Sequence, residues 1–282
     1  MELIVGALRA LFDGILLPFR GMPALVGLAV VSLLTAIGML LVFKATSNQK
    51  KIGEVKRRIY AGLFEIRLFN DDARAIFRAQ AEILINNLKY VGLSLVPMLW
   101  MIVPILLVLT QLQFHYGYRG LEPGQKTVFK VVMKKEKAPQ TALAREKGPS
   151  VTLELPEGLK LETPGVWIPS KGEIAWRLAA VDPGDYIVNV KVEGEAPVAK
   201  RVHVGDSIVR RSPSRLEAGF KNQLFYPAEP PLPKSSSLAG VYVDYDDAEV
   251  NLFGWKTLWM VVFFILSIVF GFALKGAFKV DL

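Results

Sequence analysis

The chain lacks cysteine altogether and has only two histidines, His115 and His203, far apart in the sequence. Disulfides, thiol catalysis and cysteine-bound zinc are therefore excluded, and a histidine-based metal site is not expected. The sequence also contains no nucleophile–base pair, no cluster of metal ligands and no phosphate loop of the form G-x-x-x-x-G-K-[ST]. We therefore predict a protein that is not an enzyme and that needs no cofactor and no metal.

Charge is missing from three long stretches of the chain. Residues 21–43, 90–114 and 257–274 are uncharged runs of 23, 25 and 18 residues. About 20 apolar residues span a bilayer core of roughly 30 Å, so all three runs qualify, the last one marginally. Hydrophobic residues make up 52% of the chain, which exceeds the usual composition of a soluble protein. The sequence therefore predicts three membrane spans.

The distribution of basic residues predicts the orientation. The loop from Lys44 to Lys89 holds ten Lys and Arg against five Asp and Glu, whereas the segment from Leu112 to Phe253 holds nineteen against eighteen. A short, strongly basic loop stays in the cytoplasm by the positive-inside rule. We therefore expect a multi-pass protein of a prokaryotic cytoplasmic membrane, with its N-terminus outside and its C-terminus in the cytoplasm. The net charge of +8 is mostly this topology signal. No nucleic-acid motif accompanies it, so no specific DNA binding is expected.

The basic loop has the pattern of a helical hairpin. Apolar residues recur at steps of three or four across 52–69 and again across 76–88, and the residues NDD at 70–72 supply a turn and an N-cap. Two such arms can pair as an antiparallel coiled coil. No turn residue separates the second arm from the apolar run that follows Lys89. One continuous helix is therefore predicted to pass from the cytoplasm into the membrane.

Outside the membrane the sequence changes to a period of two. Short alternating segments such as KTVFKVVM, EIAWRLAAV and DYIVNVKVEGE are separated by turns rich in Gly and Pro. About five to seven strands between Lys126 and Asp206 predict a small antiparallel sandwich of immunoglobulin-like type. The stretch YPAEPPLPKSSS that follows is typical of a Pro-rich linker.

The predicted fold class is an α-helical membrane protein with three transmembrane helices, a cytoplasmic helical hairpin and an inserted all-β immunoglobulin-like sandwich outside the membrane. The first 20 residues carry Arg9 and Asp13 beside one apolar face, which is typical of an amphipathic helix lying on a membrane. The predicted segments are the interfacial helix at 1–22, the first span at 23–43, the hairpin at 44–89, the second span at 90–113, the sandwich at 114–206, the Pro-rich linker and extended segment at 207–254, the third span at 255–277 and the cytoplasmic tail at 278–282.

Two stretches, LKYVGLSLVPMLWMIVPILLVL and LFGWKTLWMVVFFILSIVFGFALKGAF, together with the order of spans and hairpin, resemble the YidC-like membrane protein insertase superfamily. The likeness is to its three-span members, which are the archaeal YidC-like proteins, the insertase subunit of the ER membrane complex and the Get receptor subunit. It covers residues 25–112 and 250–282. Two features depart from the bacterial members, which carry a groove arginine in the first core span and have five core spans. The sandwich between spans two and three is also not part of the usual three-span plan.

The resemblance implies a function without covalent chemistry. Such proteins form a polar groove, open to the cytoplasm and the lipid, that receives hydrophobic client segments and lowers the barrier to their insertion. Three helices make at most part of a groove, so a membrane-protein partner subunit or a homo-oligomer is implied, besides membrane lipid and, as a further candidate, the ribosome. The groove candidates are Thr35, Asn86, Asn87, Lys89, Ser94 and Ser267, and the basic contacts of the hairpin are Lys50, Lys51, Lys56, Arg57, Arg58, Arg67, Arg74 and Arg78.

A membrane scaffold is the alternative function. It would be a subunit of a larger complex that displays the sandwich outside the membrane. The two functions differ in what the spans require, because a scaffold needs tightly packed small residues and an insertase needs a wet cleft. The basic hairpin has an alternative role as well, as a topology determinant that touches anionic lipid.

Overall fold

The structure, a computed structural model, describes residues 2–69, 71–134 and 148–280. Asn70 in the predicted hairpin turn, residues 135–147 of the predicted sandwich and residues 281–282 of the predicted tail lie outside the described residues. The chain divides into two compact units. We call Met1–Gly27 with Leu109–Met260 the sheet-bearing unit, and Leu28–Val108 with Val261–Leu282 the helical unit.

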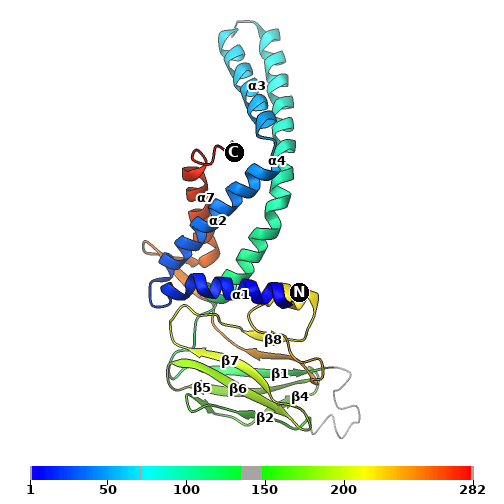
Figure 1. Cartoon of the computed structure of the whole chain (residues 1–282), viewed down its shortest axis with the longest axis vertical. Coiled ribbons are helices and arrows are strands. Elements are labelled where there is room, and N and C mark those ends of the chain that lie inside the picture. Colours follow the sequence, from blue (N-terminus) through cyan, green and yellow to red (C-terminus); the bar gives the residue numbers. More distant parts are fainter. Residues whose placement is uncertain (1, 70, 135–147, 281–282) are drawn as a thin grey trace. The chain divides into compact units, whose positions relative to one another are not determined.

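The helices follow the apolar runs and the hairpin pattern of the sequence (Figure 1). The predicted passage from hairpin to second span is one unbroken helix, α4, with 44 residues. Pro97 and Pro104 lie inside it. The helices are α1 (Glu2–Leu16), the 3-10 helix η1 (Leu17–Phe19), α2 (Ala24–Thr46), α3 (Gln49–Leu68), α4 (Ala73–Tyr116), α6 (Phe220–Phe225) and α7 (Trp259–Leu274).

The third apolar run differs from its prediction. Its helix begins at Trp259 and not at residue 255, because residues 249–258 form the two-stranded hairpin of β10 and β11. Phe253 and Gly254 make the turn with φ angles of 52° and 95°, which is the left-handed pair that a tight hairpin requires. The 16 residues of α7 extend about 24 Å at about 1.5 Å each. Among the described residues, α2 and α4 are the helices long and apolar enough to cross a membrane, and α7 is shorter.

The strands form two larger antiparallel sheets besides this hairpin. One sheet has six strands in the order β3-β5-β1-β9-β8, with β4 also pairing with β5, and the other has three in the order β2-β6-β7. The strands are β1 (Lys126–Met133), β2 (Val151–Glu154), β3 (Leu159–Leu161), β4 (Val166–Ile168), β5 (Glu173–Ala180), β6 (Gly184–Val192), β7 (Val198–Val204), β8 (Ser214–Leu216), β9 (Leu238–Val243), β10 (Glu249–Leu252) and β11 (Trp255–Leu258).

The two sheets share one apolar core, which makes the region a β-sandwich. Phe129 and Trp176 from the six-stranded sheet and Val188 and Val202 from the three-stranded sheet belong to the same buried cluster. The ring centroids of Phe129 and Trp176 lie 6.4 Å apart in an edge-on arrangement, which is favourable for aromatic pairs. The period-two pattern of the sequence therefore marks the strands of a real core.

The prediction of a Pro-rich linker and extended segment at 207–254 is wrong. Its residues belong to the sandwich, because β8 and β9 lie in the six-stranded sheet and β9 pairs directly with β1. Leu232 within the Pro-rich stretch and Val241 in β9 are buried in the shared core. Prolines suppress the alternating pattern on which strand prediction depends, so composition alone made this part resemble a tether.

One ion pair is buried inside the sandwich. Lys200 lies in β7 in register with the core residue Val188, and its ammonium contacts the Glu229 carboxylate. Lys200 Nζ also donates to the carbonyl oxygen of Ser212 at 2.6 Å. Burial lowers the pKa of Lys200, and the nearby charge of Glu229 opposes that shift. This pair ties β7 to the segment that precedes β9.

Candidate functional site

The two arms of the hairpin, α3 and the first part of α4, pack against each other along a line of contact that we call the seam, and the seam includes small residues. A Cβ added to Gly62 of α3 would lie 2.7 Å from Ile83 Cγ1 and 3.7 Å from the carbonyl oxygen of Ala79, both in α4. The apolar pattern predicted across 52–69 includes Leu63, and the pattern across 76–88 includes Leu84, but both side chains are exposed. A pattern search that looks for large apolar residues passes over the small ones that allow two helices to approach closely.

The basic residues predicted for the hairpin lie mostly on its surface. Lys56 is half-buried, and its ammonium lies 5.5 Å from the centre of the Tyr90 ring, within the range of a cation–π contact. Arg78 forms an exposed ion pair with Glu82 at 3.4 Å. The other six, which are Lys50, Lys51, Arg57, Arg58, Arg67 and Arg74, are exposed.

Four of the predicted groove residues lie on α4. The side chains of Asn86, Asn87 and Ser94 donate to backbone carbonyl oxygens one turn earlier, at 2.9, 3.0 and 3.0 Å. Asn86 is buried, at helical spacing from the seam residues Ala79 and Ile83, so it belongs to the hairpin seam. Asn87 and Lys89 are exposed and Ser94 is half-buried. Asn86 is therefore not on the same face as Asn87.

The other two predicted groove residues lie where α2 and α7 meet. The two helices run parallel, since Ser32 Oγ donates to the Phe263 carbonyl oxygen at 3.4 Å and, further along, Leu274 packs against the apolar cluster that contains Leu40. Thr35 and Ser267 each follow that contact by about one helical turn, so they lie at a similar level. The Ser267 hydroxyl is buried and has no hydrogen-bond partner among the described residues.

The six candidates therefore divide into two sets. Among the described residues, no hydrogen bond joins any two of them. Sequence reasoning missed Ser32, which is fully buried between the two helices. Its spacing of three residues from Thr35 on an otherwise apolar helix is the signal that could have found it.

The sheet-bearing unit contains a polar junction that the sequence did not predict. Arg210, in the segment after β7, contacts Asp13 of α1 through Nε at 3.1 Å and Nη2 at 3.0 Å, and its Nη1 donates to Gln111 at 3.0 Å. His115 Nε2 lies 3.0 Å from the Asp13 carboxylate, and its Nδ1 lies 2.9 Å from the carbonyl oxygen of Gln111. Both ring nitrogens of His115 therefore face acceptors.

Asp13 is the centre of this junction. Burial opposes its ionisation, but the hydrogen bond to His115 and the positive charge of Arg210 outweigh burial, so the pKa of Asp13 is lowered. The carboxylate therefore stays charged at neutral pH. It fastens α1 to the end of α4 and to the segment after β7. The signal in the sequence was the acidic residue Asp13 within a mostly apolar helix.

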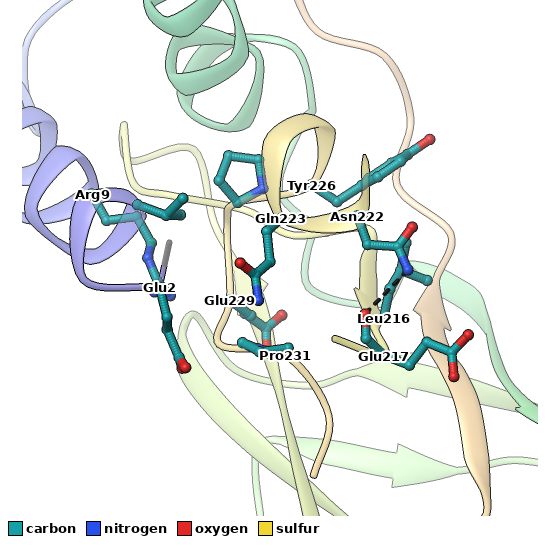
Figure 2. A pocket seen from close by; sticks show the side chains of 11 residues that line it. Glu2, Arg9, Leu216, Glu217, Asn222, Gln223, Tyr226, Glu229 and Pro231 are labelled. Atoms are coloured by element: carbon teal, nitrogen blue, oxygen red, sulfur yellow. Dashed lines mark hydrogen bonds between the residues drawn. The ribbon is translucent and has the colours of Figure 1, made fainter. Parts of the chain in front are cut away.

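A narrow cleft lies between α1 and the part of the sandwich around α6. Figure 2 shows Glu2 and Arg9 of α1 on one side and Asn222 of α6 on the other, with Gln223 and Glu229 between them. The cleft has a volume of about 10 Å³, which is room for about one water molecule. It is therefore a packing seam between α1 and the sandwich and not a ligand site.

Comparison with known proteins identifies no relative. No family model matches the chain, and no curated protein matches it. Among solved structures, part of the chain is similar to the crystal structure of the S-layer protein rSbsC, with 19% sequence identity and a TM-score of 0.23. That similarity covers 30% of this chain and 11% of the S-layer chain, and it carries no argument about function.

Proposed function

We propose that this chain is a membrane protein insertase-like subunit that receives hydrophobic segments at a polar, cytoplasm-facing groove of its spans. In this proposal α2, α4 and α7 are the three spans of a YidC-like protein in a prokaryotic cytoplasmic membrane. The N-terminus and an immunoglobulin-like sandwich lie outside, and the hairpin and C-terminus lie in the cytoplasm. The function requires no covalent step and no cofactor.

The environment of α4 is the observation that carries the proposal. In the most apolar stretch of α4 only 6% of residues are buried inside the chain, against 33% for the corresponding stretch of α2. Exposing side chains such as Leu99, Trp100 and Val103 to water would cost about 25 cal/mol per Å² of apolar surface. A bilayer, a partner subunit or an apolar client segment removes that cost.

Continuity with the hairpin supports the same function. Because α4 includes both the second hairpin arm and the apolar stretch, a segment captured at the basic hairpin can follow one helix to the membrane. The hydroxyls of Ser32, Thr35 and Ser267 are buried at the contact of α2 and α7, so a client would meet them where these two helices separate. Polar groups at this depth would reduce the cost of several kcal/mol that an unsatisfied backbone group of the client otherwise meets in lipid.

The alternative is a scaffold subunit that displays the sandwich. The observation that favours it is the docking of α1, because Arg210 and His115 hold Asp13 and thereby make α1 part of the folded sheet-bearing unit. A rigid platform of this kind suits a structural role in a larger complex. The two functions differ in whether water reaches the faces of the spans that carry Ser94 and Ser267.

Single cysteines test this difference, since the chain has none of its own. Each serine has an apolar, exposed neighbour at the same depth, Leu95 next to Ser94 and Ile268 next to Ser267. A water-soluble thiol reagent added from the cytoplasmic side should modify Ser94→Cys and Ser267→Cys in the membrane-embedded complex. Leu95→Cys and Ile268→Cys should stay unmodified, because hydrocarbon suppresses the reactive thiolate.

A photo-crosslinker at Ser94 extends the test to the client. It should capture an apolar nascent segment, whereas the same group at Leu95 should capture mainly lipid. If both serine positions are as unreactive as their neighbours and no client is captured, the insertase proposal is wrong and the scaffold is favoured.

A further inference from the structure

A cavity of about 280 Å³ lies in the sheet-bearing unit, beside the polar junction of α1. Its wall includes Asp13 and Arg20 from the N-terminal segment, Arg201 and His203 from the outer face of β7, and Arg211 from the segment that follows β7. Next to the lining residue Val209, the Ile208 amide donates to the carbonyl oxygen of Arg20 at 3.1 Å, which joins the two segments. The volume exceeds that of a single water many times over and admits an ion with its hydration waters.

The charges on the wall are not balanced. The cavity is lined by the four arginines Arg20, Arg201, Arg210 and Arg211 and by three carboxylates. Asp13 pairs with Arg210, and Glu229 pairs with Lys200 behind the wall. Asp185 lies 2.7 Å from His203 Nδ1, but burial lowers the pKa of His203, so this contact does not balance the charge of Asp185.

Three arginines form no direct ion pair. Among the described residues, no carboxylate lies within ion-pair distance of Arg20, Arg201 or Arg211. The wall therefore presents an excess of positive charge toward the cavity.

Arg211 is the most unusual of the three. It is 5% exposed, and it is held by backbone carbonyl oxygens, that of Tyr118 at 2.7 Å and that of Ser207. Its Nε is buried and has no hydrogen-bond partner in the part of the chain that the structure describes. The guanidinium also lines a second cavity of about 190 Å³ beside Gly120.

Removing a charge from water costs several kcal/mol. Burial lowers the pKa of Arg211, and the nearby acidic groups of Tyr245, Asp206 and Asp185 oppose that shift without cancelling it. A bound anion would supply the remaining compensation.

We propose that this cavity is a binding site for a phosphate-type anion, with Arg211 at its base and the exposed Arg20 and Arg201 at its mouth. Guanidinium groups suit this ligand because their planar forks donate paired hydrogen bonds to phosphate oxygens. The phosphate comes from the headgroup of an anionic lipid or from free phosphate. Exposed apolar residues of the N-terminal segment, including Leu11 and Leu17, would bring lipid headgroups close to the mouth.

The test uses the full chain in two kinds of lipid nanodisc. In phosphatidylcholine nanodiscs, inorganic phosphate is titrated and binding is measured calorimetrically. In nanodiscs that also contain phosphatidylglycerol, native mass spectrometry counts the phosphatidylglycerol molecules that each protein retains. Phosphate binding indicates a free anion, and retained phosphatidylglycerol indicates a lipid headgroup. Either result supports the site.

Variants locate the binding. Arg201→Gln combined with Arg20→Gln changes two exposed side chains and should weaken binding about tenfold or more, which corresponds to at least about 1.4 kcal/mol. Arg211→Gln should abolish binding. If that variant does not fold, the double variant Arg201→Gln with Arg20→Gln still tests the site. Arg177→Gln, an exposed arginine on β5 of the other sheet, is the matched control and should bind as the unmodified chain does. The absence of both ligands from the unmodified chain, or equal binding by the mouth variant and the control, would overturn the proposal.

Discussion

Two tryptophans show how differently the two units treat the same side chain. Trp176 in the sandwich is 4% exposed, whereas Trp100 in the middle of α4 is 65% exposed. In the sheet-bearing unit both sheets turn their apolar residues inward to one cluster. In the helical unit a smaller cluster around Ile52 and Phe43 lies near the hairpin, and most large apolar side chains of α4 point outward.

The difference is the one expected if the helical unit lies in lipid, as proposed above, and the sheet-bearing unit lies in water. A fold in water must bury its apolar surface within itself, because the hydrophobic effect is its main driving force. A helix in lipid has no such need, and its packing depends on close contact and on polar groups. A buried polar group therefore has a different meaning in each unit. In the sandwich it supports the fold, whereas in the apolar helices it is a candidate contact point.

The largest expected effect is a loss of stability of the sandwich, while the helices stay folded. Lys200→Met would leave the Glu229 carboxylate buried without its partner, which typically costs about 3–5 kcal/mol. Thermal unfolding followed by the near-ultraviolet signal of the tryptophans should show a lower midpoint, with the helical far-ultraviolet signal retained. The double variant Lys200→Met with Glu229→Gln removes both charges and should recover most of the loss. A double variant as unstable as the single one would show that the ion pair is not the cause.

An intermediate effect is expected in the hairpin. Gly62→Leu would force the seam apart, because even a Cβ at this position lies 2.7 Å from Ile83 Cγ1. Overpacking of this kind costs about 1–3 kcal/mol, which exceeds the gain of roughly 0.5–1 kcal/mol from replacing a helical glycine. Protease should therefore cleave the hairpin faster in membrane vesicles. Ala61→Leu places the same side chain on the exposed face and should leave cleavage unchanged; equal rates for the two variants would contradict the seam.

The smallest effect concerns the attachment of α1 and depends on pH. The folded-state pKa of Asp13 lies below its ordinary value of 3.8, so its charge stabilises the fold above that value. The contribution is lost as the pH falls through the lowered pKa. Protease cleavage of α1 should therefore stay slow from pH 7 to pH 5 and accelerate below about pH 3.8. Asp13→Asn should accelerate it already at pH 7 and remove the pH step; a step of unchanged size in this variant would assign it to another group.

The elements that the sequence predicted well are those with a strong local pattern. The hairpin and α4 follow from apolar residues at helical spacing, and β1, β5 and β6 follow from alternation. Prediction was wrong where the local pattern was weak or interrupted. The Pro-rich stretch before β9 has no alternation, although Leu232 within it is buried in the core. The start of α7 was placed too early because Trp255 and Leu258 are as apolar as the helix that follows them.

The candidate site divides in the same way. Thr35 and Ser267 could be chosen from the sequence because a hydroxyl stands out in an uncharged run. The direction in which α2 and α7 pack decides that Thr35 and Ser267 lie at a similar level. It also decides that Ser32 lies between the two helices. Asn86 and Asn87 are equivalent in sequence, yet Asn86 is buried while Asn87 is exposed. A helical rotation of about 100° between successive residues separates them.

The sequence by itself determined where the chain is apolar, where it is basic and where it alternates, because span length, loop charge and strand period are properties of consecutive residues. Only the tertiary structure decided which distant groups meet. Asp13 and Arg210 are 197 residues apart, Lys200 meets Glu229 across 29, and β9 lies beside β1 after a separation of more than a hundred residues. Such partners are selected by the shape of the folded core and by the cost of leaving a buried charge unpaired, and no local pattern carries that information.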